Sequence, residues 1–202
     1  MPSSVQSLLD NSDLSLTGNC KWGESPKSRR SGVYLVSLSP SAYTNEGILG
    51  QAPVSTENVK AWITRVPEIE LDGKTMKSPE PIIARLSGFW LPDESILYIG
   101  MTMQPLSKRI GQYYRTDLGK RAPHAGGHWT KTLSILDELV VYYADCDNPD
   151  EVEDDLIETF IEHVSEESKS NLHDPRRPFP FANLAYPKGN IKAHGLGKTV
   201  KR

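Results

Sequence analysis

Four polar side chains on different predicted elements form a combination suited to cutting a phosphodiester bond. Tyr34 and Tyr98 fall in two predicted strands, Arg109 in the helix after the second strand, and Glu158 in a later helix. Hydrolysis of this bond needs a deprotonated water, charge stabilisation on the phosphate and help for the leaving oxygen, and a hard cation held by a carboxylate supplies part of each. An arginine fork matches the phosphate oxygens. These residue types predict phosphodiester chemistry if the fold gathers them.

Three short apolar runs predict the strands. Residues 33–38 form a β-branched and aromatic run that Ser39-Pro40 ends, and residues 95–100 form a second run that ends at a glycine. A third run covers residues 139–143. The two tyrosines therefore belong to strands that can pair.

Apolar spacing of three and four residues predicts two helices that carry the other candidates. The first begins at Pro105 and runs to about residue 114. The second begins after Asn148, which can act as its cap, and runs to about residue 164. Glu158 falls at the edge of the apolar stripe of this helix, where a carboxylate can be held by the core and still reach a ligand.

The rest of the chain is predicted to be an insertion and two loose ends. Residues from about 40 to 94 contain several prolines, one short amphipathic helix and an Asp72-Gly73 hairpin signal, which together indicate an inserted subdomain. Residues 1–30 are predicted to be a flexible N-terminal arm. Residues 187–202 are predicted to be a basic, flexible tail.

Composition and charge limit the class of protein. A chain of 202 residues with 37% hydrophobic and 24% charged content predicts one globular domain, or a smaller one with a large insertion. No apolar run is long enough to span a bilayer and the N-terminus does not resemble a signal peptide, so we expect a cytoplasmic protein with no membrane partner. Cys20 and Cys146 form neither a disulfide framework nor a CxxC site.

The net charge of −3 hides an uneven distribution. Residues 104–132 hold six Lys and Arg against one acidic residue, residues 133–168 hold none against thirteen, and residues 170–202 hold seven against one. Basic stretches can hold a phosphate backbone and an acidic one can hold a cation, although charges on solvated faces explain the same pattern.

Five short motifs occur in an order that resembles the GIY-YIG nuclease superfamily, in particular its restriction-endonuclease-like members. The motifs are Gly32-Val33-Tyr34, Tyr98-Ile99-Gly100, the helix over residues 108–114, Glu158 in the run 154–158, and Asn183 in the run 181–184. The match covers residues 31–39 and about 95–185.

The resemblance implies an α/β (α+β) fold. A small three-stranded antiparallel sheet is flanked by helices, with the nuclease domain spanning residues 31–186. The family joins its first two strands by a short connection, whereas 63 residues separate Tyr34 from Tyr98 here. The fold expected for this chain therefore has a long insertion between its first two core strands, and insertions of this kind in related restriction enzymes often contribute to DNA recognition.

The resemblance also implies roles for three tyrosines. Tyr34 would be the general base or would orient the attacking water, and Tyr98 would contact the region of the scissile phosphate. Tyr113 would hydrogen-bond to the phosphate or assist proton transfer. Because an ordinary tyrosine has a pKa near 10, a base role requires nearby positive charge, for which Lys108, Arg109 and a metal ion are the candidates.

The remaining roles concern charge and support. Arg109 would stabilise the developing charge on the phosphate. Glu158 would hold a single divalent cation, Mg²⁺ or Mn²⁺, and Asn183 would support the site by hydrogen bonding. The resemblance thus makes Glu158 the metal ligand.

The expected partner is DNA. Basic side chains in and after the first predicted helix are candidates for contacts with it, and a solvated loop explains several of them nearly as well. These candidates are Lys108, Arg115, Lys120, Arg121, His124, His128 and Lys131. Cutting both strands of a duplex needs two active sites or sequential action, so a homodimer is a further possibility.

Each candidate also has a purely structural explanation. Tyr34 and Tyr98 can be ordinary strand aromatics, Glu158 a solvated helix residue, Arg109 a surface salt-bridge residue and Asn183 a turn residue. The leading hypothesis is a magnesium-dependent DNA endonuclease of restriction type. The alternatives are a non-catalytic nucleic-acid-binding protein that keeps the fold, and a structural or protein-interaction domain.

Overall fold

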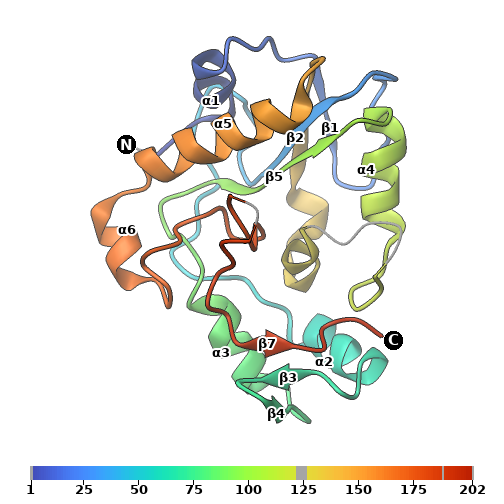
Figure 1. Cartoon of the computed structure of the whole chain (residues 1–202), viewed down its shortest axis with the longest axis vertical. Helices are drawn as coiled ribbons and strands as arrows, with labels where there is room; N and C mark the ends of the chain where they lie inside the picture. The colour runs from blue at the N-terminus through green and yellow to red at the C-terminus, as the bar shows by residue number, and fades with distance from the viewer. Residues whose placement is uncertain (1, 122–126, 188, 202) are drawn as a thin grey trace.

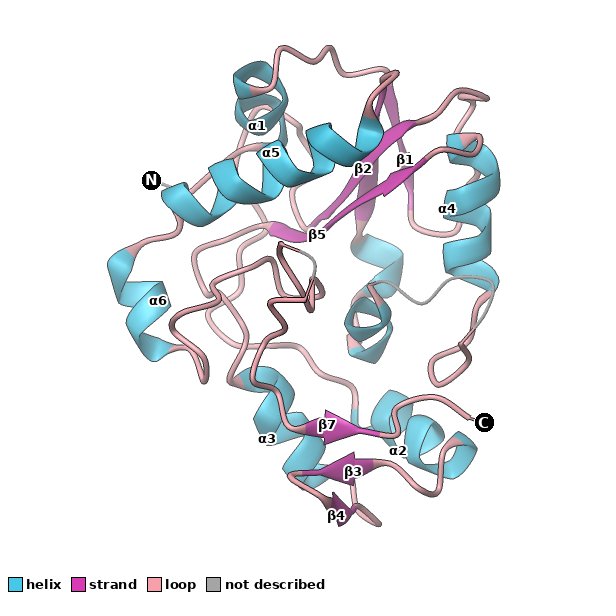
Figure 2. Cartoon of the chain, viewed as in Figure 1, coloured by secondary structure: helices cyan, strands magenta, loops and turns pink. Residues whose placement is uncertain are grey.

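A four-stranded antiparallel sheet forms the centre of the molecule (Figures 1 and 2). The computed structural model describes residues 2–121, 127–187 and 189–201. The strands lie in the order β1-β6-β2-β5. Their bounds are β1 Gly18–Lys21, β2 Gly32–Ser37, β5 Ile96–Thr102 and β6 Val140–Asp145. The expected class of a mixed α/β fold with an antiparallel sheet is confirmed, and β2, β5 and β6 are the three predicted strands.

The expected number of strands is wrong because residues 2–30 are folded onto the domain. Strand β1 pairs with the outer edge of β6 and adds a fourth strand. The helix α1 (Val5–Asn11) precedes it, with a Ser4 side chain that accepts a hydrogen bond from the Ser7 backbone N–H. The spacing of Val5, Leu8 and Leu9 places all three in the core, which is why this segment is held rather than flexible.

Packing of α1 gives a testable expectation. Leu8→Ala removes a fully buried side chain and is expected to lower the free energy of unfolding by roughly 2–5 kcal/mol, measured by urea denaturation. Asn11→Ala, at an exposed position of the same helix, is the control and is expected to change it little. Equal stability of the two variants would show that the arm does not contribute to the core.

Helices cover both faces of the sheet. The helix α5 (Pro149–His163) packs with α1 on one face, through an apolar cluster that includes Leu35, Ile99 and Phe160. The helix α4 (Leu106–Arg115) and the inserted segment cover the other face. Short 3-10 turns η1 (His128–Thr132) and η2 (Leu136–Glu138) precede β6, and α6 (Glu166–Asn171) follows α5.

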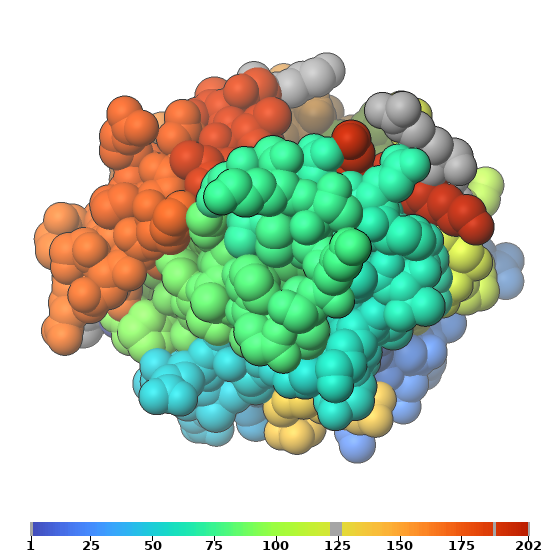
Figure 3. Space-filling view, turned by 90° about the horizontal axis from the view of Figure 1, so that it is seen from below, coloured from blue at the N-terminus to red at the C-terminus, as the bar shows by residue number. Residues whose placement is uncertain are grey.

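The insertion between β2 and β5 forms a second structural unit. It contains α2 (Thr56–Arg65), the hairpin strands β3 (Glu70–Leu71) and β4 (Lys74–Thr75), and α3 (Glu80–Ser87). The predicted Asp72-Gly73 hairpin is confirmed, since both residues have the positive φ that a type I′ turn requires. Seen from below, this unit occupies the centre of that end of the molecule (Figure 3).

The C-terminal segment is docked on the insertion, in contrast to the predicted flexible tail. The strand β7 (Leu196–Gly197) pairs with β3 and completes a three-stranded sheet in the order β4-β3-β7. The Trp62 indole N–H donates to the Thr199 carbonyl at 2.9 Å, and Arg85 pairs with Asp72 and donates to the His194 carbonyl at 2.7 Å. Backbone pairing and these buried partners fix a stretch whose composition alone indicates mobility.

Candidate active site

Strand β5 lies at an edge of the sheet, and its outward-facing backbone groups position two of the candidate side chains. The Ile99 N–H donates to Asn183 Oδ1 at 2.9 Å, and Asn183 Nδ2 donates to the Ile99 carbonyl at 2.8 Å. Two residues further along, the Met101 backbone N–H hydrogen-bonds to the carboxylate of Glu153 on α5. Because every second residue of a strand faces the same way, Asn183 and Glu153 occupy neighbouring places on this edge, about 7 Å apart along the strand.

Three tyrosines meet beside this edge. The ring centroids of Tyr34 and Tyr98 are 5.9 Å apart, those of Tyr98 and Tyr113 are 5.6 Å apart, and those of Tyr34 and Tyr113 are 6.4 Å apart. Gly100 makes room for them. A Cβ at this position would lie 2.7 Å from Tyr98 Cε1 and 2.9 Å from the Tyr34 hydroxyl. The glycine at the end of the second motif is therefore needed for the close approach of both rings.

Gly100→Ala is expected to lower the free energy of unfolding by about 1–3 kcal/mol, because the added methyl group must displace aromatic rings from a packed core. Thermal unfolding measures the change. Gly50→Ala is the matched control, since a Cβ there meets nothing within 4 Å. If both variants unfolded at the same temperature, the tyrosine rings would not be packed as described.

Arg109 on α4 joins Tyr34 to this cluster. The guanidinium and the Tyr98 hydroxyl both hydrogen-bond to the Tyr34 hydroxyl. Burial nevertheless raises the pKa of Tyr34 to about 12, and the charge of Arg109 opposes this rise only in part. The lowered pKa that a base role requires is thus not found, and Tyr34 is a neutral phenol at pH 7. Its side chain is 0% exposed, and of the two tyrosines only Tyr98 lines the cleft described below.

Glu153 is the carboxylate that faces Arg109 and the tyrosines. Burial raises its pKa to about 7, with further contributions from Asp154 and Asp150, and the Met101 N–H and the charge of Arg109 oppose the rise. Glu153 lies three and four residues before Leu156 and Ile157, both buried, so it belongs to the stripe of α5 that faces the sheet. This spacing is the signal in the sequence that could have identified it.

Glu158 lies outside the cluster that contains Arg109. It is exposed, and its partner is Tyr186, whose pKa is raised by burial and by the Glu158 carboxylate. Glu158 comes one residue after the buried Ile157, and a step of one residue turns a helical side chain by about 100° away from the stripe. The structure therefore places Glu153, and not Glu158, next to Arg109 and at the lining of the cleft described below.

Tyr113 points into the core rather than toward a ligand. Its hydroxyl donates to the Gly127 carbonyl at 2.6 Å and is hydrogen-bonded to the Thr130 hydroxyl. Burial raises its pKa well above the usual value. The ring packs against Tyr98 and Tyr34, so the structure assigns Tyr113 to support of the tyrosine pair, not to contact with a phosphate.

The basic candidates separate into exposed and buried groups. Lys108 and Arg115 on α4 are exposed, as are Lys120 and Arg121 beyond it. Lys120 pairs with Asp117 at 2.7 Å.

Two of the other three basic candidates are buried. Lys131 is buried and donates to the carbonyls of Tyr113 and Thr116 at the end of α4, so it caps a helix. His128 is also buried, and His124 lies outside the described residues.

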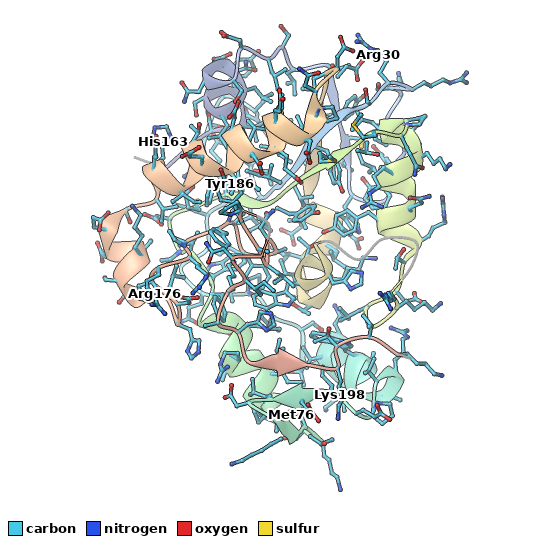
Figure 4. The ribbon with its side chains drawn as sticks, in the orientation of Figure 1. Arg30, Met76, His163, Arg176, Tyr186 and Lys198 are labelled. Atoms are coloured by element: carbon cyan, nitrogen blue, oxygen red, sulfur yellow. The ribbon has the colours of Figure 1, made fainter. Side chains whose placement is uncertain are left out.

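A cleft of about 560 Å³ opens beside the cluster. Tyr98 and Asn183 line its floor, and Asp150, Glu153 and Asp154 line the wall formed by α5. The segment after Asn183 forms the opposite wall, and Figure 4 shows Tyr186 of this segment close to α5. The cleft is thus lined by a tyrosine, an asparagine and three carboxylate side chains.

A cation bound at this cleft would have few protein ligands. Within residues 2–121, 127–187 and 189–201, no group of three or more His, Cys, Asp and Glu side chains is arranged to hold a metal ion. Of the three carboxylates that line the cleft, Glu153 is the one that also interacts with Arg109. Mg²⁺ in phosphoryl-transfer sites is commonly held by one or two carboxylates together with water and substrate phosphates.

Comparisons of the chain with protein-family models, with curated proteins and with solved structures found no match. Among the described helices, none is long and apolar enough to cross a membrane.

Proposed function

We propose that this protein is a divalent-metal-dependent DNA endonuclease of restriction type that acts in the cytoplasm. The observation that supports the proposal best is the gathering of Tyr34, Tyr98, Arg109 and Glu153 at the β5 edge, around Gly100. Residues from three motifs of the GIY-YIG resemblance contribute to it, and the carboxylate comes from the expected helix.

The roles follow from where each group lies. Arg109 would bind the phosphate and stabilise its developing negative charge. Tyr98 borders the cleft, so its hydroxyl can reach the phosphate region. Tyr34, a neutral phenol that accepts hydrogen bonds from Arg109 and Tyr98, would fix the orientation of both. This makes Tyr34 a positioning residue in the free protein.

Glu153 would hold Mg²⁺ or Mn²⁺, with Asp150 and Asp154 on the same wall of the cleft. When bound, such a cation neutralises phosphate charge and lowers the pKa of its water. Asn183 would support the site by holding the Ile99 backbone, which lies on β5 between Tyr98 and the Met101 N–H that bonds to Glu153.

Contacts with DNA would come from exposed side chains on and beyond α4, namely Lys108, Arg115, Lys120 and Arg121. Such side chains hold the phosphate backbone and carry little sequence information, so recognition would fall to the insertion. A homodimer would bring two sites to the two strands of a duplex.

The test is incubation of the purified protein with a mixture of unmethylated plasmid and phage DNA, in magnesium or in EDTA. Discrete fragments in magnesium alone are the expected result. Intact DNA in both lanes, together with intact branched and single-stranded substrates, would refute the proposal.

The activity should depend on pH through Glu153. A carboxylate binds a cation in its ionised form, and the ionised fraction increases as the pH rises above the pKa of about 7. Cleavage at low, subsaturating Mg²⁺ is therefore expected to increase about tenfold from pH 6 to pH 7.5 and then to level off. Saturating Mg²⁺ should move the midpoint to lower pH, because the bound cation favours the carboxylate. A cleavage rate that depends on neither pH nor Mg²⁺ concentration would exclude Glu153 as the metal ligand.

One observation favours a non-catalytic nucleic-acid-binding protein as the second candidate. Tyr34 is fully buried, so it does not touch a ligand in this arrangement. A salt-sensitive gel shift without cleavage in Mg²⁺ or Mn²⁺ would support this reading instead.

A further inference from the structure

The two walls of the cleft differ in chemistry. Asp150, Glu153 and Asp154 line one wall, whereas the opposite wall carries no charge within the described residues. It consists of Ala182 and of residues from the segment that follows Asn183, including Leu184, Tyr186 and Ile191.

The described residues of this second wall present apolar surface to the cleft. Ile191 is 53% exposed. Among the described residues, it is the one large, exposed apolar side chain that lines this cleft. Tyr186 lies at the same wall, half-buried, with its ring 6.1 Å from that of Phe179. An exposed apolar side chain beside candidate catalytic groups suits contact with a ligand.

The backbone of this wall is held in place by many bonds. Ala185 and Ile191 pair as a β-bridge, and the Tyr186 N–H donates to the Asn190 carbonyl at 3.1 Å. The Lys192 backbone N–H donates to the Leu184 carbonyl at 2.8 Å.

The Lys192 side chain fixes the base of the same wall. It is 2% exposed and its Nζ donates to the carbonyls of Phe179, Pro180 and Phe181 at 3.3, 2.9 and 3.1 Å. The stretch that leads to Asn183 and Leu184 is thereby anchored, so the apolar side chains are presented on a fixed support.

These properties decide what the cleft can hold. A phosphate alone leaves most of a cleft of about 560 Å³ unfilled, and without a bound cation the carboxylate wall repels it. A nucleobase is neutral, flat and partly apolar, and base rings stack on aromatic and apolar side chains. Its exocyclic amino group can donate to a carboxylate, as cytosine N4 does to Asp or Glu. A base within a duplex is stacked and paired, so it reaches such a pocket only when it is extruded or unpaired.

We propose that the cleft binds one unpaired nucleobase of the substrate, next to the bond that is cut. The ring lies against Leu184, Tyr186 and Ile191, and its amino edge points toward Asp150 and Asp154. The assignment rests on the proposed nuclease function for its choice of ligand, and it adds how the substrate is held: one base at the cleavage position is unpaired, or is extruded from the duplex when the protein binds.

Binding without cleavage tests the assignment. Glu153→Gln protein in EDTA is titrated with two hairpin oligonucleotides that differ by one unpaired 2-aminopurine, which carries an exocyclic amino group and fluoresces less when stacked. We expect at least about tenfold tighter binding of the hairpin with the unpaired base, and a loss of its fluorescence on binding.

Matched variants locate the base. Ile191→Asp and Tyr186→Ala, each in the Glu153→Gln background, are expected to remove the preference and the fluorescence change. Ile48→Asp changes another exposed isoleucine, remote in sequence from the cleft residues, and should preserve both. Circular dichroism and thermal unfolding confirm that each variant is folded. Equal affinity for the two hairpins, or equal effects of Ile191→Asp and Ile48→Asp, would overturn the assignment.

The outcome is separable from that of the nuclease proposal. Cleavage of fully paired DNA by the wild-type protein, with unchanged 2-aminopurine fluorescence, would retain the nuclease function and refute the base-binding cleft. A fluorescence change without cleavage of any substrate would retain the cleft and refute the nuclease function.

Discussion

Glu153→Gln is expected to reduce magnesium-dependent DNA cleavage by roughly 10³-fold. A bound cation contributes several kcal/mol of transition-state stabilisation, and each 1.36 kcal/mol lost lowers the rate about tenfold. The glutamine keeps the size of the side chain and removes the charge that would hold the cation. Glu153 faces Arg109 and accepts the Met101 N–H on the edge strand, which places its carboxylate at the cleft. Rates of plasmid nicking over a range of Mg²⁺ concentrations measure the effect.

Glu158→Gln is the matched control, since it makes the same change on the same helix at an exposed position. It should leave the rate within about twofold of the wild type. Isothermal titration with Mn²⁺ provides a second reading, in which Glu153→Gln loses binding and Glu158→Gln retains it. Loss of activity in Glu158→Gln alone would return the metal site to the residue that the sequence pattern suggested.

Stability gives an independent check that Glu153→Gln is folded. The pKa of Glu153 is raised in the folded protein, so between its unfolded value near 4.3 and about 7 the folded state binds more protons than the unfolded one. The contribution of Glu153 to the free energy of unfolding therefore falls as the pH rises through that window. At pH 8 the glutamine variant should unfold at a higher temperature than the wild type, even though it is inactive.

Arg109→Ala is expected to lower the cleavage rate by about 10²- to 10³-fold, the usual cost of removing one preorganised donor to a developing oxyanion. Arg109→Lys should recover little of this loss, because a lysine lacks the planar fork that binds two phosphate oxygens. Arg109→Ala also removes a hydrogen bond to Tyr34 and the positive charge that limits the rise of the Tyr34 pKa. Single-turnover cleavage at saturating protein separates the loss in rate from any loss in affinity.

Arg115→Ala is the control for Arg109→Ala, because it removes the same side chain from an exposed position of α4. It should weaken DNA binding modestly and reduce the salt dependence of binding, with the single-turnover rate unchanged. If both arginine variants showed equal defects in affinity and no defect in rate, Arg109 would be a phosphate contact without a role in the chemistry.

The sequence determined those features that depend on local patterns. Strands β2, β5 and β6 and helices α4 and α5 lie where apolar periodicity predicted them, because each element buries one face or is buried on both. The Asp72-Gly73 hairpin depends on two residues that tolerate positive φ. The sequence also marked Gly100 as the end of an apolar run, whereas the space that two tyrosine rings occupy around it is a feature of the tertiary structure.

Tertiary structure decided which polar groups meet. Many acidic residues lie on α5, and only the packing of its buried stripe against the β5 edge brings Glu153, rather than Glu158, to Arg109. Local sequence patterns likewise did not predict that Lys131 is buried or that both chain ends form strands. Lys131 is buried because the end of α4 offers carbonyls without partners, and β1 and β7 form because strand edges elsewhere in the chain accept them. Such partners are distant in sequence. A local pattern therefore predicts an element and its apolar face. The unsatisfied backbone groups of neighbouring elements select the side chains that complete the site.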